Sequence, residues 1–339
     1  MTPAGAKPET DASNPGQHPP ARGAAAMFKL LRPHQWVKGA FVVVGPFYGG
    51  VIGQAGVAAA VACTLVAFSL ASSFSYIIND LADVEADRQH PRKRRRPIAS
   101  GAVSVSQAYG LAAACLLGCV LACVGVGLLP SLTGGSGGGA GAGAINWVPA
   151  AWAAAAVLAY LINTAAYSAV LKHRPIMDVM SLAMGFVLRV LGGCAAAAVA
   201  PSTFLLNCTL FLAMYLAFGK RLGERRTMVT AEDATKVRAV QARYTSDLLR
   251  MLVVVTAVAL LVAYTEYVQA MAEKYTVGFN LLWLTVLPAV YAMLRSIMLL
   301  EQGKYDDPTE LAVRDRPFQF AAALFVLLTG AVMWYVQLR

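Results

Sequence analysis

A cluster of oxygen-bearing side chains occupies residues 79–87, Asn-Asp-Leu-Ala-Asp-Val-Glu-Ala-Asp. Positions 79, 83 and 87 repeat every four residues and Asp80 lies three residues before Asp83, so on a helix these groups share one face. The four carboxylates of this stretch repel one another unless a cation offsets their charge. Mg²⁺ prefers such oxygen ligands and usually completes its octahedron with substrate phosphate. We therefore predict a magnesium site formed by Asn79, Asp80, Asp83 and Asp87.

A basic segment follows the acidic stretch directly, from Arg88 to Arg96, and continues as Pro-Ile-Ala-Ser-Gly. Acidic groups for a metal followed by basic groups for phosphate are what a diphosphate site requires, and we predict phosphate contacts from Arg94 and Arg96. Two simpler interpretations stay open. The acidic stretch could be a solvated helix end, and the basic run could serve only to bind an anionic leaflet or to set the topology.

The composition indicates a membrane protein. Hydrophobic residues make up 58% of the 339 positions and charged residues 14%, whereas soluble domains carry about 25% charged residues. A net charge of +10 is compatible with nucleic acid binding, but in a membrane protein such an excess marks the cytoplasmic loops, and we expect no nucleic acid partner. The six cysteines lie in apolar runs, which disfavours a disulfide framework.

Nine apolar segments are long enough to cross a bilayer, which takes about 20 residues in a helix. The sequence thus predicts an all-α fold in which residues 27–339 form one nine-helix transmembrane catalytic domain. Residues 1–26, rich in Pro, Gly and Ala, are predicted to be a disordered tail. The expected spans are residues 37–55, 57–79, 106–130, 147–167, 178–199, 202–219, 247–268, 279–300 and 318–337.

The basic residues orient this map. With alternate connecting segments assigned to opposite sides of the membrane, every Lys and Arg except Arg189, Lys274 and Arg339 lies on or beside the segments of the same side. Lys and Arg concentrate in cytoplasmic loops, so we predict a cytoplasmic N-terminus and an acidic motif at the cytoplasmic mouth of a bundle in the cell membrane. Arg189 falls near the middle of the fifth span, where an intramembrane charge indicates a functional site.

The acidic and basic motifs together resemble the first aspartate-rich motif of the UbiA-type intramembrane prenyltransferases. The resemblance rests on Asn-Asp-x-x-Asp-x-x-x-Asp at 79–87 and His-Pro-x-Lys-Arg-x-Arg-Pro-Ile-Ala-Ser-Gly at 90–101, and it extends over essentially all of residues 27–339. It implies a nine-helix bundle whose active site opens to the cytoplasm and laterally to lipid. Family members that prenylate aromatic rings carry a second Asp-x-x-x-Asp motif after the sixth helix, which holds a second magnesium ion.

The chain departs from that pattern after its sixth span. Residues 219–224 are Gly-Lys-Arg-Leu-Gly-Glu, so Lys220 and Arg221 precede a single acid, Glu224. This departure is similar to the polyprenyl-phosphate (decaprenyl-phosphate) phosphoribosyltransferase branch of the family. That branch implies transfer of 5-phosphoribose from phosphoribosyl diphosphate to a polyprenyl phosphate, with release of diphosphate, and suggests a place in cell wall biogenesis. Further segments that match the branch are residues 31–38, 167–179, 188–193 and 305–317.

The resemblance assigns roles to the candidate residues. The expected catalytic residues are Asp80, Asp83, Asp87 and Arg189. The expected substrate-binding residues are Lys38, Asn79, Arg94, Arg96, Tyr167, Lys172, Lys220, Arg221 and Glu224. Alternatives stay open for four residues. Lys172 could be only a topogenic charge, and Tyr167 only an interfacial aromatic. Glu224 could be a metal ligand or a partner of Arg221 or Arg225, and Asp178 could be a helix cap or a site residue.

Two other functions stay open. One is a prenyltransferase of the same family that uses a prenyl diphosphate, against which the Lys220-Arg221 pair counts. The other is a transporter or lipid-binding protein, but transporters place charges deep in the membrane at broken helices, and here nearly all charge gathers on one side. The expected partners are a polyprenyl phosphate, phosphoribosyl diphosphate and membrane lipids, and a homo-oligomer is left open.

Overall fold

The computed structural model describes residues 23–89, 93–132, 147–227, 244–304 and 314–337. The regular secondary structure of this part is helical except for one short hairpin of β1 (Thr276–Val277) and β2 (Phe279–Asn280), which confirms the predicted all-α class. Most of the predicted N-terminal tail lies outside the described residues. The described part begins with a short helix, α1 (Ala24–Leu30), which is followed by the 3₁₀ helix η1 (Pro33–Gly39).

Eight helical segments are long and apolar enough to cross a membrane, and the chain is a multi-pass membrane protein. They are α3 (Ala55–Ala82), α5 (Val105–Leu132), α6 (Trp147–Ala169), α7 (Met177–Ala196), α8 (Thr203–Thr227), α10 (Ser246–Ala270), η5 with α12 (Leu281–Thr285 and Val286–Glu301) and α14 (Arg316–Gln337). Each overlaps one of the predicted spans. The orientation of the bundle stays a prediction.

The first predicted span, 37–55, is a composite rather than one long helix. The α-helical part, α2 (Ala40–Tyr48), has nine residues and contains Pro46. At 1.5 Å per residue it is about 14 Å long, well short of the roughly 30 Å hydrocarbon core. It continues directly from η1, whose seven residues add about 14 Å at 2.0 Å per residue. The nine-helix count therefore depends on whether η1 and α2 together are counted as a span.

The eighth predicted span, 279–300, also starts later than expected. Gly278 has a φ of 79° and forms the turn of the β1–β2 hairpin, which lies at the N-terminal edge of the predicted span. The side chain of Asn280 then accepts a hydrogen bond from the backbone N–H of Leu282 and caps η5. The apolar residues at 279–280 belong to this hairpin, because a glycine and a capping asparagine interrupt the helix there.

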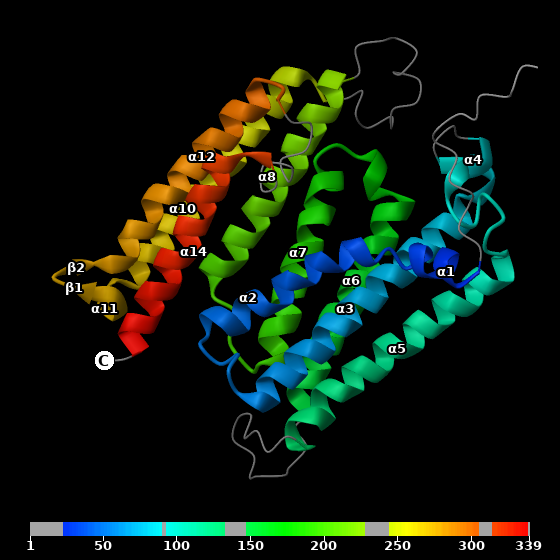
Figure 1. Cartoon of the computed structure of the whole chain (residues 1–339), viewed down its shortest axis with the longest axis horizontal. Helices are drawn as coiled ribbons and strands as arrows, with labels where there is room; N and C mark the ends of the chain where they lie inside the picture. The colour runs from blue at the N-terminus through cyan, green and yellow to red at the C-terminus, as the bar shows by residue number, and fades with distance from the viewer. Residues whose placement is uncertain (1–22, 90–92, 133–146, 228–243, 305–313, 338–339) are drawn as a thin grey trace, which may run out of the picture.

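The long helices form two groups (Figure 1). One contains α2, α3, α5, α6 and α7, and the other α8, α10, α12 and α14; α7 packs against α8 and joins the groups. The short elements α4 (Val84–Gln89), η2 (Lys93–Arg95) and η3 (Leu171–His173) lie at the ends of α3 and α6, whereas α11 (Ala272–Tyr275) follows α10 at the other end of the molecule. Both acidic and basic motifs thus gather at one end of the bundle.

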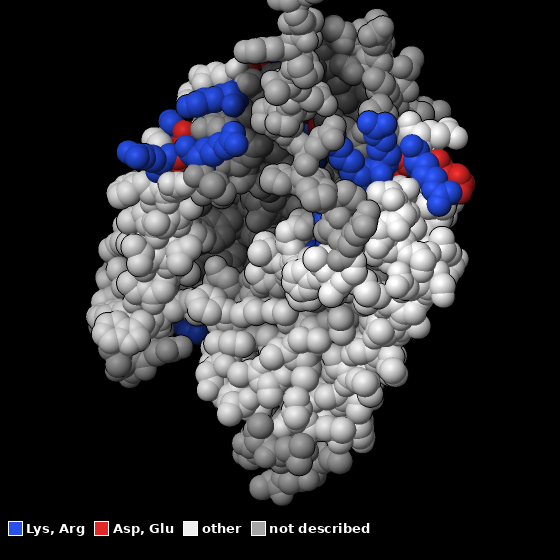
Figure 2. All heavy atoms as spheres, turned by 45° about the vertical axis from the view of Figure 1, so that its right-hand side comes forward, with Lys and Arg blue, Asp and Glu red and all other residues white. Residues whose placement is uncertain are grey.

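Charge is confined largely to that end. Figure 2 shows Lys, Arg, Asp and Glu in two groups at the rim, with a hollow between them and an almost uncharged surface below. Exposed apolar side chains, among them Trp152, Leu158 and Ile162 on α6, cover the flanks of the helices. An apolar belt with charge at one end is the surface expected of a protein that lies in a bilayer.

A close approach of backbones fixes α2 against α7. A Cβ atom added at Gly193 would lie 1.8 Å from the carbonyl oxygen of Val42. Such a separation is impossible, and the obstacle is backbone rather than a side chain that can rotate away. Small residues at helix interfaces in membranes permit this kind of contact, so Gly193 holds the composite first segment against the helix that carries Arg189.

We predict that Gly193→Ala separates α2 from α7 and lowers the thermal midpoint of the detergent-purified protein. Overpacking of this kind costs about 1–3 kcal/mol. Gly110→Ala on α5 is the matched control, because nothing lies within 4 Å of its added Cβ. Equal midpoints for the two variants in a thermal unfolding assay would contradict the close approach.

Candidate active site

The acidic stretch forms at the end of a helix that is longer than a bilayer core. α3 has 28 residues and is therefore about 42 Å long, so its last turns extend beyond a hydrocarbon layer of about 30 Å. The helix ends at Ala82, Asp83 follows in a turn, and α4 begins at Val84. This junction places the acidic side chains where the chain leaves the membrane.

Asp80 is the most heavily paired of these acids. Its side chain is 4% exposed and accepts two hydrogen bonds from Nη2 of Arg32, at 2.7 and 2.8 Å, and one from Nη1 of Arg96 at 3.0 Å. Arg32 has a φ of 53°, a conformation that is uncommon for a residue other than glycine. Its guanidinium also lies 4.7 Å from the ring centroid of Tyr76. A residue held in such a conformation beside a buried acid indicates a functional position.

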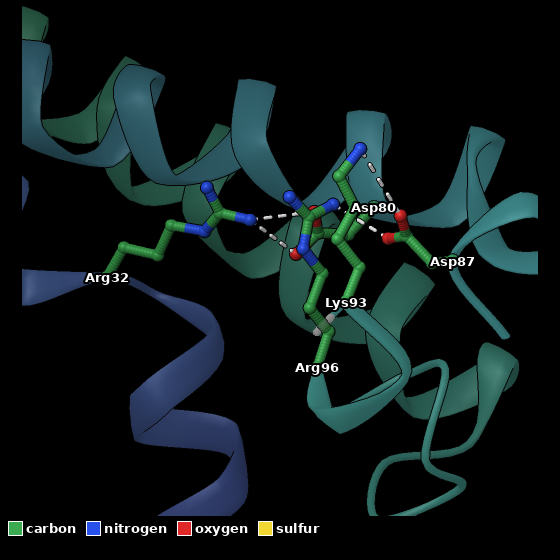
Figure 3. A network of polar contacts seen from close by, with 5 residues as sticks. All are labelled: Arg32, Asp80, Asp87, Lys93 and Arg96. Carbon is green, nitrogen blue, oxygen red and sulfur yellow. Dashed lines mark hydrogen bonds and ion pairs between the residues drawn. The ribbon is translucent and has the colours of Figure 1, made fainter. Parts of the chain in front are cut away.

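Arg96 joins Asp80 to a second buried acid (Figure 3). Its Nη1 lies 2.7 Å from Oδ2 of Asp87, and Nζ of Lys93 lies 3.8 Å from Oδ1 of the same carboxylate. Asp80 and Asp87 therefore face the same guanidinium, although the turn at Asp83 interrupts the helix between them. Asp83 is exposed, and among the described residues it has no ion pair. The predicted shared face therefore contains two kinds of acid: Asp80 and Asp87 are buried in ion pairs, and Asp83 is exposed.

The donor chemistry of this stretch suits magnesium, although the residues are not gathered around one point. Within the described ranges no group of three or more His, Cys, Asp or Glu side chains converges as a metal cluster would. Carboxylate and amide oxygens are nevertheless the ligands of a hard cation. Asn79 and Asp83 lie one turn apart, and their side chains form no ion pair or hydrogen bond with described side chains. Asp80 and Asp87, by contrast, form ion pairs with arginine and lysine.

A polar cavity begins beside Asn79 and enters the bundle. Its volume is about 120 Å³, and it contains four predicted site residues together with hydroxyl and amide groups from α3, α6 and α7. The residues of the lining that matter here are Lys38, Ser72, Asn79, Tyr160, Asn163, Tyr167 and Arg189. The ring nitrogen of Trp36 donates to Ser73, and Ser73 donates to the carbonyl of Leu31, so α3 fixes the segment that carries Lys38.

Arg189 lies at the inner end of this cavity. It is 4% exposed and about 18 Å along α7 from Met177. Its guanidinium donates to the carbonyl of Gly185 at 2.7 Å, to the Tyr160 hydroxyl at 3.1 Å and to Ser72 at 3.3 Å. No carboxylate in the described part of the chain is paired with it. An arginine held by neutral groups keeps an uncompensated positive charge, which suits an anionic ligand.

The sixth-span motif forms a second cluster around Asp178. This carboxylate, 0% exposed, accepts a hydrogen bond from Tyr244 at 2.8 Å and pairs with Arg221 at 3.2 Å. Arg221 also lies 3.3 Å from Glu224, so Glu224 is a partner of Arg221. Burial raises the pKa of the Tyr244 hydroxyl, and the hydrogen bond to Asp178 raises it further. Tyr244 therefore stays protonated, as a donor to Asp178.

The remaining predicted residues differ in their exposure. Arg94 in η2 and Lys220 on α8 are exposed, and Lys172 in η3 is half-buried. Among the described residues, neither Arg94 nor Lys172 contacts either cluster, so their assignment to substrate stays a prediction. Asp178 lies in the first turn of α7 and also pairs with Arg221, and its assignment as a helix cap or a site residue stays open.

Sequence reasoning overlooked three residues that complete the site. They are Arg32, Tyr160 and Tyr244. Arg32 lies in a segment that matched the family branch, so a cation before Pro33 was a usable signal. Tyr160 and Tyr244 had none, because a tyrosine at a membrane interface is common and their partners are distant in sequence.

Comparison with known proteins identifies the family. The model of the UbiA prenyltransferase family matches residues 40–321. The chain belongs to the UbiA prenyltransferase family. Two relatives called decaprenyl-phosphate phosphoribosyltransferase are each 30% identical: that of Mycolicibacterium smegmatis over 96% of this chain and 98% of its own, and that of Corynebacterium glutamicum over 94% and 91%. This UbiA protein therefore belongs to the decaprenyl-phosphate phosphoribosyltransferase branch of the family and is a transferase.

Solved UbiA structures share the fold. A UbiA homolog from Archaeoglobus fulgidus, bound to GPP and Mg²⁺, has a TM-score of 0.61 at 19% identity, covering 91% of this chain and 99% of its own. A digeranylgeranylglyceryl phosphate synthase has a TM-score of 0.57 at 11% identity, with 92% and 96% covered. At these identities the likeness establishes the fold of the present UbiA protein and not its substrate.

We predict that Arg189→Met lowers transferase turnover by more than about 100-fold, which corresponds to about 2.7 kcal/mol, without lowering the thermal midpoint. An arginine buried without a counter-ion contributes little to stability, and an apolar residue of similar length is tolerated or stabilising at such a position. Turnover and thermal unfolding are measured on the same preparation. A large fall in midpoint would show instead that Arg189 has a structural role.

Proposed function

We propose that this protein transfers 5-phosphoribose from phosphoribosyl diphosphate to a polyprenyl phosphate and releases diphosphate. The observation that carries the proposal is the ion pair between Arg221 and the buried Asp178. At the place where ring-prenylating members of the family are expected to carry a second acidic motif, this chain buries a guanidinium. The names of the relatives at 30% identity support the same reaction.

The donor diphosphate would bind at the acidic stretch. Magnesium held by Asn79, Asp80, Asp83 and Asp87 would neutralise charge on the departing diphosphate. Asp83 and Asn79 are open to it, and Asp80 and Asp87 would become available as Arg32 and Arg96 exchange a carboxylate for a phosphate oxygen. Arginine suits that exchange because its planar fork matches carboxylate and phosphate alike.

The acceptor phosphate would bind on the cavity side of the motif. Lys38 and Arg189 supply positive charge there, and Tyr167 and Asn163 supply polar atoms. A phosphate monoester is already ionised near neutral pH, so its oxygen can attack the anomeric carbon without a strong general base. As the new C–O bond forms, the bond from that carbon to the diphosphate breaks. The residues then act by positioning and by charge stabilisation.

The proposal includes a location. The charged rim, with the site beside it, would face the cytoplasm of the cell membrane, where the positive-inside rule places Lys and Arg. A water-soluble phosphosugar would then reach the motif from that side, whereas the lipid acceptor would enter from the bilayer.

The decisive experiment offers the purified protein both classes of donor. Labelled phosphoribosyl diphosphate with polyprenyl phosphate and Mg²⁺ is expected to yield a labelled lipid and free diphosphate, and removal of divalent metal by EDTA is expected to stop the reaction until Mg²⁺ is restored. Consumption of a prenyl diphosphate with an aromatic acceptor, without any labelled lipid from the first donor, would refute the proposal in favour of prenyl transfer.

We predict that Asp83→Ala reduces turnover by more than about 100-fold, because the open carboxylate of the motif would hold the metal. Glu85→Ala is the matched control: Glu85 is exposed in the same stretch and pairs with Arg88 at 2.8 Å. Initial rates are measured across a Mg²⁺ titration. If Asp83→Ala keeps full activity with an unchanged Mg²⁺ dependence, the assignment of the metal site is wrong.

A further inference from the structure

The turn that leads into α7 contains a strained residue. Ile176, the N-cap of this helix, has a φ of 68° and a ψ of −48°. These angles lie near those of the γ-turn with positive φ, which is rare and strained, and a positive φ is a genuine outlier for a β-branched residue. The side chain of Ile176 is exposed, so its own packing does not explain the conformation. Backbone strain of this kind persists only where the surrounding structure enforces it, and it is concentrated at functional sites.

The hydroxyl group of Tyr244 holds this turn. Its oxygen accepts a hydrogen bond from the backbone N–H of Ile176, and its proton is donated to Oδ1 of Asp178 at 2.8 Å. The other carboxylate oxygen of Asp178 accepts a hydrogen bond from Arg221 on α8. The Tyr244 side chain is buried, and its ring packs edge-on against Phe218 of α8. The hydroxyl therefore uses both its donor and its acceptor capacity on two residues of one turn.

The chain at Tyr244 is itself anchored to α8 and α10. The side chain of Thr245 accepts a hydrogen bond from the backbone N–H of Leu248 and caps α10. The hydroxyl of Ser246 accepts a hydrogen bond from Nε of Arg225 on α8 at 3.1 Å. The clamp on the turn at Ile176 therefore starts from a fixed helix end, and a group fixed in this way can hold a strained backbone.

Lys172 is the residue whose position depends on this turn. It lies in η3, a single 3₁₀ turn of three residues between the end of α6 and the start of α7. Arg174 and Pro175 connect η3 to α7, and the backbone N–H of Asp178 donates to the carbonyl of Arg174 at 3.1 Å. Hydrogen bonds within a 3₁₀ turn have poorer geometry than those of an α-helix. The path of η3 therefore depends on the elements at its two ends.

We propose that Tyr244 is a positioning residue that directs the ammonium group of Lys172 toward a substrate phosphate. The inference rests on the proposed function and on the prediction that Lys172 binds phosphate. Tyr244 does not touch the substrate: its hydroxyl fixes the turn at Ile176, and the turn fixes the backbone of η3. Lysine is a point charge on a flexible four-carbon stem, so the position of its backbone decides whether its charge reaches the phosphate.

Hydrogen exchange tests the clamp without any substrate. Tyr244→Phe removes the hydroxyl and keeps the ring. Tyr215→Phe is the matched control, because Tyr215 is buried in the same apolar cluster and its hydroxyl contacts Ser296 instead. The full-length protein in nanodiscs is exchanged, and peptides that contain residues 174–180 are read by mass spectrometry. We expect exchange at Ile176 to be at least about tenfold faster in Tyr244→Phe and unchanged in Tyr215→Phe. Equal exchange in the two variants would show that the hydroxyl does not hold the turn.

Steady-state kinetics test the positioning role. Tyr244→Phe is expected to raise the donor KM about tenfold while kcat changes less than about threefold, because a phosphate contact that serves binding is lost. Tyr215→Phe is expected to change neither. In a Lys172→Met background, Tyr244→Phe is expected to add less than about twofold, because the group through which it acts is already gone. An undiminished effect in that background would mean that Tyr244 has only a structural role.

Ile176→Gly provides a second test if Tyr244→Phe folds poorly. Glycine adopts a positive φ freely, and the side chain of Ile176 is exposed, so the substitution relieves the strain and removes few contacts. The double variant Ile176→Gly/Tyr244→Phe is expected to regain the thermal midpoint and a donor KM within about threefold of the unmodified protein. A double variant no more stable than Tyr244→Phe would contradict a clamp that opposes strain.

The outcomes separate the two proposals. The exchange measurement needs no substrate, and the kinetic cycle is run with whichever donor the protein consumes, phosphoribosyl diphosphate or a prenyl diphosphate. If only the prenyl diphosphate is consumed, the proposed function fails, and coupling between Tyr244 and Lys172 on that donor still supports the positioning role. Phosphoribose transfer without such coupling would leave the function standing and refute the positioning role.

Discussion

Pairing of buried charge is the constraint on which this structure depends. A charged group in a low-dielectric interior is strongly destabilising unless it has a partner, and each acid buried at the charged end of the bundle has one. Asp80 has Arg32 and Arg96, Asp87 has Arg96 and Lys93, and Asp178 has Arg221. Asp315, at the start of α14, likewise binds Arg295 through two contacts of 2.6 and 2.9 Å. These pairs add to the apolar packing that already joins α1 to α3 and α7 to α8.

The same constraint links the two halves of the site through α7. Its first turn carries Asp178, which binds α8 through Arg221, and its middle carries Arg189, which binds α3 and α6 through Ser72 and Tyr160. Gly193, one turn further, admits the backbone of α2. One helix therefore sets the position of the segment bearing Lys38, the polar cavity and the sixth-span cluster relative to one another. A shift of α7 would alter all three together.

Much of this arrangement is predictable from the sequence, and the failures have physical reasons. Runs of about 20 apolar residues locate helices such as 147–169 to within a few residues, since bilayer thickness sets their length. The composite first segment was not predictable from hydropathy, because an apolar run does not distinguish a 3₁₀ helix from an α-helix. Helical spacing predicted that Asp83 and Asp80 share one face. The helix instead ends at Ala82, and the arginines bind Asp80 and Asp87 while Asp83 is exposed. The Arg32–Asp80 pair joins residues 48 apart, and spacing alone does not indicate such a contact.

The two buried arginines show how function can be inferred from an incomplete pair. Arg221 has its counter-ions in Asp178 and Glu224, so its charge is already compensated in the folded chain. Arg189 is as deeply buried, yet its described contacts are a carbonyl, two hydroxyls and aromatic faces. Those groups stabilise a guanidinium without cancelling its charge. A fold that tolerates this cost retains a site for an anion, and the adjoining polar cavity, which runs back to Asn79, is where a phosphate would supply the missing charge.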